Sequence, residues 1–95
     1  MKINNIILSD WKFLEFHNVW ERSAEPTKIG SFNFRNSIQI YKYKDNTLRL
    51  HFMGNLYFLN HLFDREEFSK IEEIDEAKEY VDKYLVRYDF LKVFI

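Results

Sequence analysis

The side chains of this sequence that could do acid–base or metal chemistry are few. The three histidines are His17, His51 and His61, and the chain contains no cysteine. If His51 and His61 lie on consecutive hairpin strands, they point to opposite faces of the sheet and cannot share a metal ion. The carboxylates that follow His61 form a solvated run, where no burial raises a pKa for general acid catalysis. We therefore expect no catalytic residue, no metal site and no cofactor, and we expect that the chain is not an enzyme.

The carboxylates are nevertheless clustered. Residues 64–82 hold nine Asp and Glu against three Lys and Arg, although the whole chain has a net charge of only −1. Such a surface attracts a basic partner over a long range. We expect a protein partner with a basic surface to contact a set of acidic residues and two aromatic anchors: Asp64, Glu66, Glu67, Phe68, Glu72, Glu73, Glu76, Glu79 and Tyr80.

An alternative is single-stranded nucleic acid. Aromatic and basic residues alternate within residues 32–49, a pattern typical of sheets that stack bases and contact phosphates. The basic side chains that would contact phosphates are Arg35, Lys42, Lys44 and Arg49. In the register expected below, the tyrosines at 41 and 43 face away from Lys42 and Arg49. Because the net charge is also slightly negative, a protein partner is preferred to nucleic acid.

The clearest element that could position these groups is a helix over residues 71–88. Apolar residues recur there at steps of three and four, which gives one apolar stripe with the acids largely on the other side. The stripe contains Ile74, Ala77, Val81 and Leu85. Ser69 and Glu72 match a capping box at the start of this helix, and a start nearer Glu73 is equally compatible with the sequence.

The residues before this helix predict an antiparallel β-meander of four to six strands. The expected strands cover residues 3–8, 11–20, 29–35, 37–44, 47–53 and 56–63, with a loop over residues 21–31. Turns at Asp45-Asn46 and Gly54-Asn55 would join the last three strands. This register pairs Tyr41 with Leu50 on the face below the helix.

The expected register also predicts the core and a second face. The core should contain Tyr41, Leu50, Phe52, Tyr57, Leu59, Ile74, Ala77, Val81 and Leu85. The second face would carry Ile38 and Ile40 and stay half apolar, so we expect residues 11–20 or another protein to cover it. That protein could be a second copy of the chain. The apolar residues 90–95 should dock as a strand or a helix extension.

The 95 residues suffice for one α+β domain, covering residues 1–95, with a long C-terminal amphipathic helix packed on the sheet. No apolar stretch is long enough to cross a bilayer and no signal peptide is evident, so we expect a cytoplasmic protein without a membrane contact. The Lys-, Asn-, Ile-, Phe- and Tyr-rich composition resembles that of small phage and mobile-element proteins and of toxin-neutralising immunity proteins. This resemblance of style implies an inhibitor that binds a host or rival protein.

Overall fold

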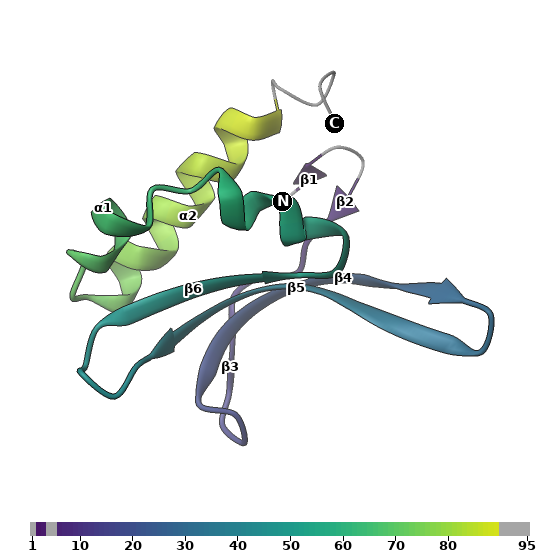
Figure 1. Ribbon diagram of the computed structural model, residues 1–95, viewed down its shortest axis with the longest axis horizontal. Coiled ribbons are helices and arrows are strands. Elements are labelled where there is room, and N and C mark those ends of the chain that lie inside the picture. The colour runs from purple at the N-terminus through teal and green to yellow at the C-terminus, as the bar shows by residue number, and fades with distance from the viewer. Residues whose placement is uncertain (1, 4–5, 90–95) are drawn as a thin grey trace.

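Figure 1 shows the computed structural model of the chain, which describes residues 2–3 and 6–89 and the side chains of residues 8–87. An antiparallel sheet in the order β3-β4-β5-β6 forms one layer, and the helical segments lie on one of its faces. The elements are β1 Lys2–Ile3, β2 Ile6–Ile7, β3 Lys12–Leu14, β4 Val19–Ile29, β5 Phe32–Lys42, β6 Leu48–Met53, the 3₁₀ helix η1 Gly54–His61, α1 Arg65–Ser69 and α2 Ile74–Asp89. This arrangement confirms the predicted α+β class.

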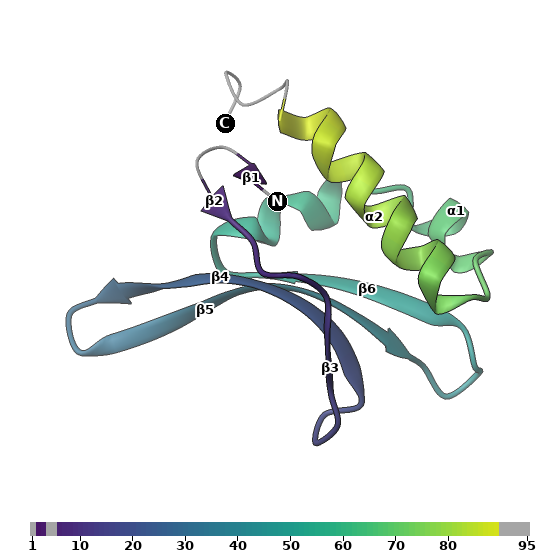
Figure 2. The same ribbon diagram turned by 180° about the vertical axis from the view of Figure 1, so that it is seen from behind.

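In the part of the chain that the structure describes, the opposite face of the sheet, which we call the outer face, carries no helix (Figure 2). The N-terminal segment expected over residues 3–8 contributes β1 and β2, which pair with each other beside the helical layer, and Leu8 is buried in the core. Residues 4–5 and 90–95 lie outside the described residues, and with them the docking expected for the C-terminal tail. In the described part of the chain, no helix is long and apolar enough to cross a membrane.

The predicted strand over residues 11–20 and the predicted loop over residues 21–31 are both wrong. The chain forms the short strand β3, turns at residues 15–18, and continues as β4 through nearly all of the expected loop. Ser23, Pro26 and Thr27 gave that stretch its loop-like composition. Pro26 is tolerated because it lies where the β4–β5 pairing is irregular, between Ala24 and Thr27, and no ladder N–H is needed there. β3 therefore extends the sheet and does not cover the outer face.

The strands predicted over residues 29–35 and 37–44 fall largely within one continuous strand, β5, and no break separates them. Asn36, expected to divide them, is 5% exposed and lies within the strand. Its side-chain amide donates to the Glu25 carbonyl at 2.9 Å and to Thr27 Oγ1 at 2.9 Å, and its oxygen accepts the Asn55 N–H at 2.8 Å. These bonds satisfy a polar side chain that would otherwise be costly to bury.

The predicted Gly54-Asn55 hairpin and the strand over residues 56–63 are also wrong. Gly54 has a positive φ of 68°, and the chain leaves β6 as the 3₁₀ helix η1. The Asn55 N–H bonds Asn36 on β5 and so does not close a hairpin. η1 then lies against the sheet with Leu56 and Leu59 fully buried. These two leucines are three residues apart, which is the spacing of a helix and not of a strand.

The register of β5 and β6 differs by one residue from the prediction. Tyr41 pairs with Arg49 and Ile40 pairs with Leu50, across a loop of residues 43–47. The loop closes through a hydrogen bond of 2.8 Å from the Tyr43 N–H to the Thr47 carbonyl, with Asn46 at a φ of 66°. Because successive residues of a strand alternate in direction, this slip turns Ile38 and Ile40 into the core and Tyr41 out of it.

The helical stripe is confirmed. α2 is 16 residues long, and Ala77, Val81 and Leu85 on it are completely buried. It begins at Ile74, close to the later of the two predicted starts. The predicted capping box is wrong, because Ser69 ends α1 and its hydroxyl donates to the Glu66 carbonyl. Of the expected core, Leu50, Phe52 and Leu59 are buried and Ile74 packs against the core cluster, whereas Tyr41 is only partly buried and Tyr57 is 56% exposed.

Candidate functional site

The acidic residues predicted to bind a partner lie together on α1, on α2 and on the turn between them. Asp64 caps α1 by accepting the Glu67 N–H at 3.0 Å, and all seven carboxylate residues are exposed. We call this surface the acidic helical face: Asp64, Glu66, Glu67, Glu72, Glu73, Glu76 and Glu79. The structure therefore brings the predicted carboxylates to one region of the surface, next to the positive N-terminal ends of two helices.

Few basic side chains neutralise this face. Lys83 lies 3.3 Å from Glu79, and Lys78 lies 3.8 Å from Asp75. Within the described part of the chain, Glu66, Glu72, Glu73 and Glu76 make no ion pair. Asp82, from the same acidic segment, points away from this face toward the sheet, where it bonds Arg22.

The two predicted aromatic anchors belong to the core. Phe68 is 2% exposed, and its ring lies 5.8 Å from that of the partly buried Tyr80. Burial raises the pKa of Tyr80 to about 12, and the nearby Glu67 carboxylate adds to this shift. The Tyr80 hydroxyl donates to Glu67 at 3.2 Å. Phe68 therefore offers no ring to a partner, and Tyr80 is committed to internal contacts.

The outer face brings Arg49 together with the tyrosines from which the expected register had separated it. Tyr41 pairs with Arg49 across β5 and β6, so the two side chains lie on the same face. The Arg49 guanidinium lies 4.6 Å from the centre of the Tyr43 ring. The expected register, with Tyr41 opposite Leu50, would place Lys42 opposite Arg49, but Lys42 lies opposite Leu48. The register objection to a nucleic-acid platform is thereby removed for Arg49, whereas Lys42 lies on the same side of β5 as Ile40 and still faces away from the tyrosines.

The basic residues that were predicted to contact phosphates differ in how far a nearby carboxylate already compensates their charge. Arg35 forms an ion pair with Glu21, which is 4% exposed, so its charge is already compensated. Arg49 lies 3.5 Å from the exposed Asp45, a weak contact in water. Lys42 and Lys44 are exposed near the end of the same hairpin. Ile38 and Ile40 lie in the core, so they do not contribute an apolar patch to the outer face, and the homodimer stays a prediction.

His51 and His61, expected on opposite faces, line one depression of about 300 Å³. It lies at the free edge of β6, where residues from β5, β6, η1 and α1 meet. We call it the Arg65 depression, and it is lined by Tyr41, Leu50, His51, Tyr57, Asn60, His61 and Arg65. Among the described residues, no group of three or more His, Cys, Asp or Glu side chains could hold a metal ion.

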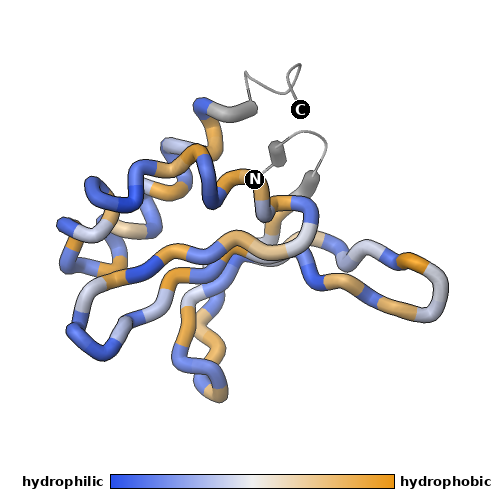
Figure 3. Tube along the Cα trace, in the orientation of Figure 1, coloured by the Kyte–Doolittle hydropathy of each residue, from blue (hydrophilic) through white to orange (hydrophobic). Residues whose placement is uncertain are grey.

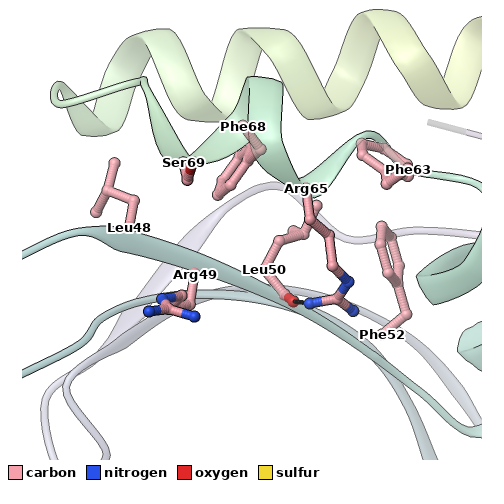
Figure 4. Close-up of a pocket in the computed structure, with 8 residues that line it drawn as sticks. All are labelled: Leu48, Arg49, Leu50, Phe52, Phe63, Arg65, Phe68 and Ser69. Carbon is pink, nitrogen blue, oxygen red and sulfur yellow. Dashed lines mark hydrogen bonds between the residues drawn. The ribbon is translucent and has the colours of Figure 1, made fainter.

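On its other side Arg65 borders a smaller, mostly apolar cavity between β6 and α1 (Figure 4). This cavity has a volume of about 60 Å³, and Phe52, Phe63 and Phe68 line much of it. The Arg65 side chain reaches from α1 to β6, where its Nη1 donates to the Leu50 carbonyl at 3.3 Å. Arg65 thus covers part of the unpaired edge of β6.

A further surface was missed by the sequence prediction because its β4 half lies in the expected loop over residues 21–31. The outer parts of β4 and β5 form a hairpin that extends beyond the helical layer and is apolar near its tip (Figure 3). We call it the β-arm. Ile29 pairs with Phe32 and Thr27 pairs with Phe34, so these side chains share one face. Ile29, Phe32 and Phe34 are 61%, 69% and 48% exposed. The strand predicted over residues 29–35 contains all three residues, but the sequence predicted a loop where its partner β4 lies.

Comparison of this chain with known protein families, with curated proteins and with solved structures finds no match.

Proposed function

We propose that this chain is a non-enzymatic protein-binding domain that docks on a basic surface of its partner through the acidic helical face. In this proposal it acts as an inhibitor of a host or rival protein, as small phage and mobile-element proteins do. The observation that carries the proposal is that Glu66, Glu72, Glu73 and Glu76 are exposed and have no ion pair within the described residues. Their charge remains available to a basic partner.

The arrangement of α2 supports a contact along the helix. Glu76, Glu79, Lys83 and Val86 follow one another at steps of three and four and are all exposed. Residues at this spacing share one side of a helix. Val86 is 51% exposed at the C-terminal end of this stripe and replaces the buried Phe68 as a candidate apolar contact. The exposed apolar β-arm, at the other end of the molecule, further supports a protein that contacts other proteins.

The test reverses three carboxylates of the acidic helical face in one variant, E72K/E73K/E76K. The matched control is D10K/E15K/E25K, which changes the net charge by the same amount at exposed acids outside the helices. Each protein is used to capture partners from a host lysate, and association with the captured partner is then measured at several salt concentrations. We expect the association rate to fall by about tenfold or more in the helical variant and with rising salt, because steering acts mainly on association.

Two results would contradict this proposal. One is an association rate that the helical variant and the control lower equally, which would reflect net charge alone. The other is a partner that still binds the helical variant at the original rate, which would place the contact on another surface. Circular dichroism of both variants checks that the fold is kept.

A second candidate function is binding of single-stranded nucleic acid on the outer face. One observation favours it: the β5–β6 register puts Tyr41, Tyr43 and Arg49 on the same face. Bases could stack on the rings while Arg49 and Lys44 contact phosphates. The test is fluorescence anisotropy with oligo-dT over a range of salt. Replacing Lys44 and Arg49 by Ala should lower the salt slope by about 1.4, the value for two contacts to a single strand, and absence of binding at low salt would refute this function.

A further inference from the structure

The Arg65 depression combines rings and a fixed positive charge in a way that the sequence did not predict. Its lining comes from four elements, with Tyr41 on β5, His51 on β6, Tyr57 and His61 on η1, and Arg65 on α1. None of its lining residues is acidic. Its volume of about 300 Å³ is at the lower end of the range for small-molecule sites, which suits a ligand the size of one nucleotide.

The Arg65 guanidinium is held in place by neutral oxygens. Its Nη2 donates to Asn60 Oδ1 at 2.8 Å, its Nη1 to the Leu50 carbonyl at 3.3 Å, and its Nε to the Asn60 carbonyl at 3.5 Å. Within the described part of the chain, no carboxylate forms an ion pair with it. Arginine has five N–H donors, so two remain beside the depression after these three bonds. This is a preoriented cation with no internal counter-charge.

Asn60 explains why Arg65 is oriented in this way. Its side-chain oxygen accepts the Phe52 N–H at 3.2 Å, and its amide nitrogen donates to the Phe52 and Tyr57 carbonyls, both at 2.9 Å. Asn60 is therefore fully used in joining η1 to the edge of β6. The same bonds hold the η1 turn that carries Tyr57 and His61.

The rings provide flat surfaces next to this cation. Tyr57 and His61 meet edge to face with ring centres 5.8 Å apart, and both residues are exposed. Tyr41 is partly buried and His51 is exposed on the adjoining strands. Aromatic and imidazole rings bind nucleobases by stacking, and arginine binds phosphate through paired N–H donors.

We propose that the Arg65 depression binds one nucleotide, with its phosphate on Arg65 and its base against the rings of Tyr57 and His61. The nucleotide is either free or part of a single strand, and in the second case the depression adds a defined site to the second candidate function. The proposal does not depend on the acidic helical face, so it can fail or succeed separately from the protein-binding function.

The test titrates the ¹⁵N-labelled protein with AMP, with inorganic phosphate and with oligo-dT, and follows amide shifts by NMR. AMP should shift the amides of residues 57–65 and of His51, and should bind more tightly than phosphate alone. Y57A and H61A should weaken AMP binding by about tenfold or more, as expected for loss of a stacked ring. F16A and H17A are the matched controls, because they remove an exposed aromatic ring and an exposed histidine outside the depression.

Arg65 also has a structural role, so R65A is paired with R65K, which keeps the charge but loses the fork of donors. If both variants fold and both bind AMP as the wild type does, the proposal is wrong. Equal affinity for phosphate and AMP would also overturn it, since the rings would then contribute nothing. If oligo-dT shows the same losses in Y57A and H61A as AMP, the nucleotide can come from a strand. Oligo-dT binding that survives both changes, without AMP binding, would refute the site.

Discussion

Arg22 on β4 and Asp82 on α2 face each other between the sheet and the helix. Arg22 Nε and Nη2 each donate at 3.0 Å to the two Asp82 carboxylate oxygens, in a parallel pair of bonds. The Trp11 indole N–H donates to the same carboxylate at 3.1 Å, and Arg22 Nη1 donates to the Ser9 carbonyl at 2.7 Å. One ion pair therefore joins α2 to the sheet and to the N-terminal segment.

Replacing Asp82 by Ala should lower the free energy of unfolding by about 3 kcal/mol, because it leaves the Arg22 charge buried without a partner. The measurement is urea unfolding followed by tryptophan fluorescence. E79A is the matched control, since it breaks the exposed Glu79–Lys83 pair on the same helix and should cost about 0.5 kcal/mol or less. Equal costs for the two variants would show that Arg22 and Asp82 do not interact as described.

Alanine substitutions at the two glycines distinguish the stability cost of a left-handed backbone from the cost of a steric clash. Gly54 and Gly30 both have positive φ, at 68° and 61°. A Cβ on Gly54 would overlap the Asn36 side-chain oxygen and the Arg35 carbonyl, whereas a Cβ on Gly30 would meet nothing within 4 Å. G30A should therefore cost about 1 kcal/mol, from the left-handed conformation alone. G54A should lower the free energy of unfolding by about 2 kcal/mol more than G30A does. Similar melting temperatures for the two variants would contradict the contact between η1 and β5.

Replacing Asn60 should allow the free edge of β6 to pair with a strand of another molecule. Asn60 accepts the Phe52 N–H and donates to the Phe52 carbonyl, so it occupies the positions of a neighbouring strand. N60A should cost about 1–3 kcal/mol and expose an unpaired edge, which promotes strand-to-strand association. Sedimentation velocity over a range of concentrations measures this. N33A, on the exposed β-arm, is the control and should remain at the wild-type size; an N60A protein that sediments like it would contradict this prediction.

The stability of the protein should decrease between about pH 10 and pH 12 in part through Tyr80. Burial raises the pKa of Tyr80 to about 12 in the folded state from 10.0, so its contribution is complete below pH 10 and is lost as the pH rises through about 12. Ultraviolet titration of phenolate absorbance should show one late tyrosine that is absent from Y80F. Y43F removes an exposed phenol hydroxyl and should leave the late step unchanged. If the late titration step persisted in Y80F, it would belong to another tyrosine.

The fold class and α2 could be predicted from sequence because their signal is local. Ala77, Val81 and Leu85 repeat at the period of a helix, and a helix of 16 residues needs no distant partner to define which of its sides is apolar. The clustering of acids before and within that helix is likewise a property of consecutive residues. The acidic helical face was therefore visible in the sequence, although its biological role is a proposal.

The tertiary structure decided the β register, η1 and the Arg65 depression, because each depends on contacts between residues far apart in the chain. Asn36 binds the Asn55 N–H across 19 positions, which sends the chain into η1 where the Gly-Asn pair alone predicted a hairpin. The loop at residues 43–47 shifts the register by one residue, and such a shift exchanges the two faces of a strand. In the sequence, Asp82 looks like one more surface acid. Only the structure shows that it bonds Arg22, which lies 60 positions earlier in the chain.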